Sequence, residues 1–158
     1  MYSEAHDRIH DAEILSNNIT KLSDSDALLR ILGFEILLKC AIFASGQNPK
    51  HSHNYKKLWL ALPGKAQKEI LESAQNRYGP HTNFEDVEKL LTNYQYVFEK
   101  GRYFFELYEG YTLEEQRELG EFWNEIGAPD IEADIQYHPM ELIALIHGLS
   151  EFIKNKAF

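Results

Sequence analysis

The sequence has few of the features that mark secreted, membrane-spanning or zinc-binding proteins. Cys40 is its one cysteine in 158 residues, which excludes an intramolecular disulfide and a zinc site built from several cysteines. No apolar run approaches the roughly 20 residues that a transmembrane helix needs, and the charged N-terminal stretch MYSEAHDRIHDAE lacks the apolar core of a signal peptide. We therefore expect a cytoplasmic protein with no membrane partner.

Motifs for common catalytic chemistry are also missing. HExxH, the P-loop, GxGxxG and GxSxG do not occur. His6 and His10 lie one helical turn apart without an acidic or sulfur partner at zinc-site spacing, so we expect both on the surface. His51 and His53 form an H-x-H pair, which alone is a weak indication of a metal site. We expect no metal ion and no cofactor.

Charge is distributed unevenly along the chain. The formal net charge of −9 argues against a protein that covers nucleic acid with its whole surface. The stretch from 50 to 68 carries no acid and five lysines, namely Lys50, Lys56, Lys57, Lys65 and Lys68. The stretch from 106 to 134 carries ten acids against Arg117 alone. The basic stretch could hold a phosphate backbone locally. Alternatively, the basic and acidic stretches are simply two solvated faces of different charge.

Helical periodicity dominates the sequence, whereas strand patterns are nearly absent. Apolar stripes, capping residues and helix-ending Gly and Pro predict helices at about 3–21, 54–62, 65–77, 83–108, 112–125 and 139–156, and one from the cap-rich SDSD at 23–26 to about 45. The expected fold is one all-α domain over residues 1–158, an antiparallel helical bundle with short accessory helices. We expect its core at about 24–109 and an acidic helical part at about 110–158.

Charged residues interrupt helices that should otherwise be buried. The segment ALLRILGFEILLKCAIFA is apolar nearly all round, which is typical of the central helix of a bundle. Glu35 and Lys39 lie four residues apart on it and are therefore neighbours on one face. They form either a surface ion pair or a buried pair whose charges satisfy each other or further partners. Arg102 and Glu106 repeat this spacing among the aromatic residues of FEKGRYFFELYE.

Three stretches in this order, GFEILLKCAIFASG, HNYKKLWLALP and VFEKGRYFFELYE, resemble the HEPN superfamily. HEPN proteins are small all-α bundles found in bacterial toxins, antiphage systems and nucleotidyltransferase-associated proteins. The similarity spans about residues 24–109 and rests on the order and spacing of short, degenerate motifs. It implies a HEPN-like bundle that forms a homodimer and serves in a toxin–antitoxin or phage-defence system.

The resemblance implies a metal-independent RNase, but the chain departs from the family's pattern. In many HEPN proteins an arginine is followed, after roughly four to six residues, by a histidine that faces the same cleft. The arginine holds phosphate and the histidine serves as general acid or base in attack by the RNA 2′-hydroxyl. Here Arg102 is followed by Glu106 and Glu109, and Arg77 reaches His81 one residue too early. This departure puts RNase activity in doubt.

The residue pattern and the resemblance together predict one polar cluster between the central helices. Its expected members are Glu35, Lys39, His53, Arg102, Tyr103 and Glu106. If the cluster is an active site, its catalytic candidates are Arg102, His53 and Glu106. The candidates for binding the substrate are then Lys39, Glu35, Tyr103, Lys56 and Lys57. Alternatively, the cluster is a buried network that fixes the register of the helices.

Three functional hypotheses follow from these observations. The first is a HEPN-like module that associates with RNA or nucleotides, as a homodimer, in bacterial stress or phage defence. The second is a non-catalytic domain that docks a basic partner protein through the acidic C-terminal third, at about residues 108–134. The third is a metal enzyme that uses His51, His53 and a carboxylate.

Overall fold

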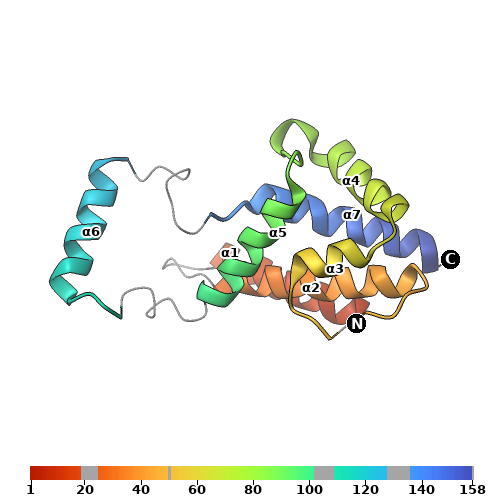
Figure 1. Ribbon diagram of the computed structural model, residues 1–158, viewed down its shortest axis with the longest axis horizontal. Coiled ribbons are helices and arrows are strands. Elements are labelled where there is room, and N and C mark those ends of the chain that lie inside the picture. The colour runs from red at the N-terminus through yellow and green to blue at the C-terminus, as the bar shows by residue number, and fades with distance from the viewer. Residues whose placement is uncertain (19–24, 50, 102–108, 128–135, 158) are drawn as a thin grey trace.

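The computed structural model describes residues 1–18, 25–49, 51–101, 109–127 and 136–157. Its elements, in chain order, are α1 (Tyr2–Asn18), α2 (Ser25–Ala44), α3 (Tyr55–Ala61), α4 (Gly64–Tyr78), the short 3-10 helix η1 (Gly79–His81), α5 (Val87–Gly101), α6 (Leu113–Glu125) and α7 (Pro139–Ala157). None of the described residues lies in a β-strand. The predicted all-α helical bundle is therefore confirmed (Figure 1).

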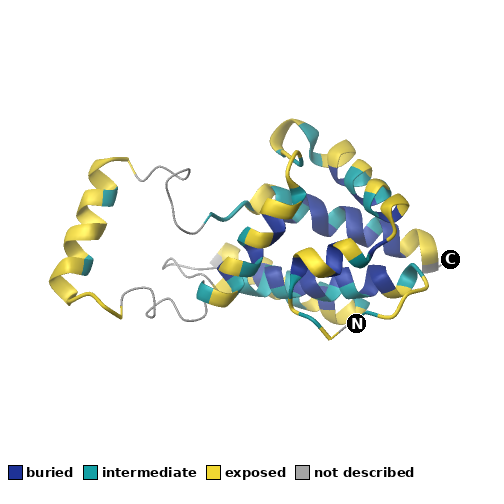
Figure 2. Ribbon diagram, in the orientation of Figure 1, coloured by how far each residue is buried: buried dark blue, intermediate teal, exposed yellow. Residues whose placement is uncertain are grey.

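Helix α2 is the centre of the bundle, as its apolar sequence predicts. Helices α1, α3, α5 and α7 all pack against it. Ile31, Phe34, Leu37 and Leu38 on α2 are fully buried. These residues share one broad face of the helix, and Gly33 and Cys40 on the opposite side are buried as well, so α2 packs against several neighbours at once. Figure 2 shows the resulting concentration of buried residues in the middle of the bundle.

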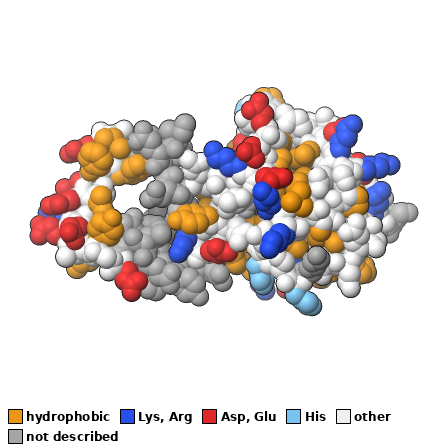
Figure 3. Space-filling model, viewed as in Figure 1, with side chains coloured by type: hydrophobic (Ala, Val, Ile, Leu, Met, Phe, Trp, Pro, Cys, Tyr) orange, Lys and Arg blue, Asp and Glu red, His pale blue; other side chains and the backbone are white. Residues whose placement is uncertain are grey.

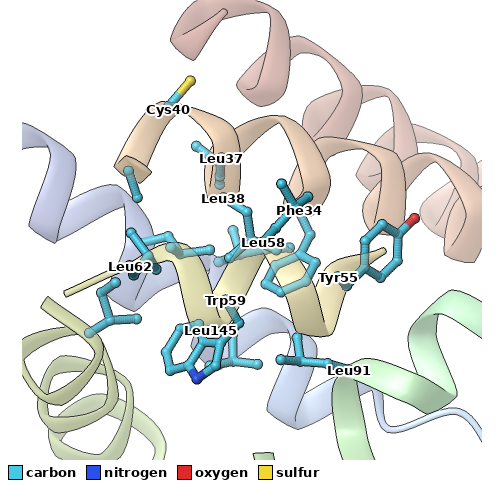
Figure 4. Close-up of a cluster of buried hydrophobic side chains, with 14 of the residues drawn as sticks. Phe34, Leu37, Leu38, Cys40, Tyr55, Leu58, Trp59, Leu62, Leu91 and Leu145 are labelled. Carbon is cyan, nitrogen blue, oxygen red and sulfur yellow. The ribbon is translucent and has the colours of Figure 1, made fainter. Parts of the chain in front are cut away.

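Helix α3 places large apolar side chains between its neighbours. Tyr55, Leu58 and Trp59 are buried, and they form the inward face of this short helix. In Figure 4 they lie between α2 on one side and Leu91 of α5 and Leu145 of α7 on the other. The stretch HNYKKLWLALP is therefore a packing element of the core, whatever else it contributes.

Helices from both ends of the chain complete the core. Helix α7 packs against α2 and α4, and its Leu142, Leu145 and Leu149 are fully buried. Helix α1 packs against α2 and contributes Ala5, which is also fully buried. The core is therefore not limited to the predicted range of about 24–109. The apolar surface of α2 is covered in part by helices that precede and follow that range.

Helix α5 begins at Val87, four residues later than the predicted start near Asn83. The Asn83 side-chain oxygen accepts a hydrogen bond from the Glu85 backbone N–H at 2.8 Å, and Asp86 accepts one from the backbone N–H three residues further on at 2.9 Å. Such side chains compete with the helix before its start and cap it at its first turn. The predicted continuation of this helix over 102–108 lies outside the described residues.

Helix α6 is held by its own local contacts. The Thr112 hydroxyl accepts a hydrogen bond from the Glu115 backbone N–H, and the Glu115 carboxylate accepts one from the Thr112 backbone N–H, which together form a capping box. These hydrogen bonds hold the pKa of Glu115 below its usual range. No side chain of α6 is buried, and the helix lies apart from the bundle in Figures 1 and 2. The helix predicted at 112–125 is confirmed, but it adds nothing to the core.

His6 is half-buried against α7, so the surface position predicted for it is wrong. Its ring nitrogen Nε2 lies 3.4 Å from the Ser150 hydroxyl on α7. Burial, reinforced by the positive charge of Lys154, lowers the pKa of His6 from its ordinary value of 6.5, while Asp7 acts in the opposite direction. His10, one turn further along α1, is exposed as predicted.

The lowered pKa of His6 predicts that the protein loses stability as the pH falls below 6.5. The unfolded chain takes up a proton on His6 near the ordinary pKa, whereas the folded protein takes it up only at lower pH, so acid favours unfolding. Urea unfolding at about pH 7.5 and about pH 5 measures the loss. We expect a smaller loss in His6→Gln and the wild-type loss in His10→Gln. An undiminished loss in His6→Gln would contradict this role of His6.

Candidate functional site

Three of the predicted site residues meet in the structure. Glu35 on α2 is buried, at 2% exposure, and its Oε1 accepts two hydrogen bonds. One comes from Lys39 Nζ, one turn along the same helix, at 2.6 Å. The other comes from His53 Nδ1, in the loop before α3, at 2.9 Å. Because a carboxylate offers acceptors alone, the hydrogen of this contact belongs to the imidazole.

The loop before α3 holds His53 in place through its two neighbours. The Ser52 hydroxyl accepts a hydrogen bond from the Asn54 backbone N–H at 3.1 Å, and the Asn54 side chain accepts one from the Lys57 backbone N–H at 2.8 Å. Asn54 is thereby the N-cap of α3, which starts one residue later than predicted. We missed the positioning role of Ser52 and Asn54, although both are common capping residues. His51 is exposed.

The burial of Glu35 decides between the two interpretations of the Glu35–Lys39 pair. The interpretation as a surface ion pair is wrong, because the carboxylate lies inside the bundle, where a charge without partners is strongly disfavoured. The two donors lie nearer to solvent, with Lys39 at 21% and His53 at 79% side-chain exposure. The second carboxylate oxygen, Oε2, is buried and accepts no hydrogen bond from any described residue. The buried carboxylate therefore orients two nitrogen groups that lie nearer to solvent. Its second oxygen, Oε2, can accept a further hydrogen bond.

The predicted basic stretch is not an unbroken basic surface. Lys56 Nζ lies 2.5 Å from a carboxylate oxygen of Glu88 on α5, which raises the pKa of Lys56. Lys65 and Lys68 each face a glutamate one turn further along α4, at 3.9 and 3.7 Å. Lys57 is exposed and forms no ion pair within the described ranges. Figure 3 accordingly shows acidic and basic side chains side by side on this face.

The remaining predicted members of the cluster, Arg102, Tyr103 and Glu106, lie outside the described residues. Their approach to Glu35 stays a prediction. The third hypothesis, a metal enzyme, requires a cluster of ligands. The described part of the chain contains no group of three or more His, Cys, Asp or Glu side chains that could hold a metal ion.

Among the described helices none is both long and apolar enough to cross a lipid bilayer. Comparison with protein-family models, curated proteins and solved structures found no match for this chain.

Proposed function

We propose that this protein is a HEPN-like helical module that binds RNA or a nucleotide where the Glu35 cluster meets solvent. The all-α bundle and the order of the three HEPN-like stretches support the proposal. The observation that carries it is the buried Glu35 carboxylate, which accepts hydrogen bonds from Lys39 and His53 and so fixes the positions of these two more exposed side chains. The proposal includes a homodimer and a setting in toxin–antitoxin or phage defence, both of which rest on the resemblance.

The Glu35–His53 contact suits the imidazole for proton transfer. A carboxylate that accepts the Nδ1–H of a neutral histidine fixes the ring and its tautomer, and the lone pair is then on Nε2. The His53 side chain is largely exposed, so Nε2 is accessible to a substrate. In the proposed site His53 removes the proton from an RNA 2′-hydroxyl, and the resulting oxygen attacks the adjacent phosphorus to form a 2′,3′-cyclic phosphate. The bond from phosphorus to the 5′-oxygen of the next nucleotide breaks, and this leaving oxygen takes up a proton. General base catalysis of this kind contributes roughly 10²–10⁴-fold to a rate.

The phosphate requires cations, and the proposal assigns this role to two groups. Lys39 offers an ammonium already held at Glu35, and Arg102 is expected to supply a guanidinium that binds two phosphate oxygens at once. Lys57, exposed and without an ion pair in the described part of the chain, supports the RNA backbone from α3. Lys56 contributes less, because Glu88 already neutralises it.

Labelled single-stranded RNA tests the proposal, in binding at low salt and in cleavage without added metal. We expect His53→Ala to reduce cleavage by about 100-fold or more while RNA still binds. We expect Arg102→Ala to weaken binding, and more so at low salt, where phosphate contacts contribute most. His51→Ala is the matched control, because it removes an exposed histidine two residues away in the same loop.

The outcomes separate three cases once circular dichroism has shown that each variant is folded. Cleavage that is lost in His53→Ala and kept in His51→Ala supports the proposed role of His53. Binding without cleavage in the wild type leaves an RNA-binding module and removes the catalytic part of the proposal. No binding of RNA or nucleotides at low salt contradicts the proposal as a whole.

A further inference from the structure

Helix α6 carries an apolar stripe that no described part of the bundle covers. Leu119, Phe122 and Ile126 are exposed, and with Trp123 they follow the i, i+3, i+4, i+7 spacing of one helix face. Phe122 is 59% exposed. Figure 3 shows hydrophobic side chains on one side of this helix and acidic ones on the other. A capped helix with such a stripe has the pattern of a docking element.

Acidic side chains flank the centre of this stripe. Arg117 pairs with two glutamates of its own helix, at 3.3 and 4.0 Å. Glu118 and Glu125 form no ion pair within the described residues. They lie four residues before and three residues after Phe122, so both are its neighbours on the helix surface. Helix α6 thus presents an exposed aromatic ring between two carboxylates that pair with no described residue.

Helix α3 of the same chain presents the complementary arrangement. Leu60 is 54% exposed, although the opposite face of this short helix is buried in the core. Lys56 and Lys57 precede it by four and three residues and therefore lie beside it on the helix surface. Lys57 has no ion pair among the described residues, and Lys56 has Glu88 alone. We call Leu60, Lys56 and Lys57 the α3 face.

We propose that α6 of one copy of this chain docks on the α3 face of a second copy. Phe122 then covers Leu60, and Glu118 and Glu125 lie near Lys57, whose charge no described residue neutralises, and beside the Lys56–Glu88 pair. Two-fold symmetry forms the contact twice and so doubles the buried area. Pairing of α6 with α6 is disfavoured, because it brings the glutamates of both helices together. The second copy is the favoured occupant because the chain itself carries an exposed leucine beside a lysine, Lys57, that no described residue neutralises.

The mass of the full chain in solution tests this arrangement. Light scattering on the eluting protein should give twice the chain mass of 18.4 kDa for the wild type. Phe122→Asp and Leu60→Asp should each give a single chain mass at the same concentration, because each places a carboxylate in both contacts.

Two control variants and a salt series complete the experiment. Leu113→Asp changes an exposed residue of α6 outside the stripe, and Ile14→Asp changes an exposed residue of α1. Both should remain dimeric, and the wild-type dimer should weaken with salt. A monomeric wild type, or a Phe122→Asp or Leu60→Asp variant that stays dimeric, would each overturn the proposal. RNA binding is measured separately, so its failure and the failure of docking are distinguishable.

Discussion

Replacing Gly148 with alanine is expected to lower the free energy of unfolding by about 3 kcal/mol. Gly148 lies on α7 where it crosses α4, and an added Cβ would stand 2.3 Å from the backbone carbonyl oxygen of Ile70. Alanine favours a helix over glycine by roughly 1 kcal/mol, but this gain is smaller than the overlap. A carbonyl inside α4 cannot move alone, so the two helices must separate. Urea unfolding followed by circular dichroism measures the change.

Gly64→Ala is the matched control for this substitution. Gly64 begins α4, and an added Cβ there meets nothing within 4 Å. The change should therefore leave the stability unaltered or raise it by up to about 1 kcal/mol. If Gly148→Ala is as stable as the wild type, α4 and α7 do not approach each other closely at this crossing.

Replacing Lys39 with methionine is expected to destabilise the protein by about 3 kcal/mol, and more than replacing its partner Glu35. Lys39→Met leaves the buried carboxylate with His53 as its remaining partner among the described residues. Glu35→Leu removes the buried charge instead, and Lys39 and His53 are exposed enough to reach water. Replacing the more exposed partner, Lys39, destabilises the protein more, because it leaves the buried charge of Glu35 without compensation.

The double variant Glu35→Leu/Lys39→Met tests this asymmetry. Without the carboxylate the lysine has no buried charge to neutralise, so the double variant should be about as stable as Glu35→Leu alone. Urea unfolding of the wild type and the three variants gives the coupling between the two residues. If Lys39→Met and Glu35→Leu destabilise equally and their effects add, Glu35 does not depend on Lys39 inside the bundle.

Short-range patterns in the sequence predicted the helices well, because helix starts and apolar faces depend on residues within one or two turns. The capping box of Thr112 and Glu115 lies within four residues, and it was readable directly. The central position of α2 was predicted from its sequence, which is apolar on nearly all sides of the helix. The start of α5 was predicted four residues too early. The Asn83 side chain accepts a backbone hydrogen bond before the helix and Asp86 accepts one at its first turn, and apolar periodicity does not show this local competition.

The candidate site could be predicted in part. The spacing of Glu35 and Lys39 made them neighbours on any helix, but spacing says nothing about burial. His53 is 18 residues from Glu35, and the contact exists because α3 packs on α2 through Tyr55 and Phe34, whose rings lie 6.1 Å apart. The pairing of Lys56 with Glu88 likewise depends on the packing of α3 against α5.

The tertiary structure also decided which amphipathic faces are covered. Helix α7 shows buried apolar residues against α2 and α4, whereas the apolar stripe of α6 is exposed. Periodicity can show that a helix has an apolar face, since this depends on the order of its own residues. Whether another helix covers that face depends on the packing of segments distant in sequence, because burial removes a side chain from water through all of its neighbours together.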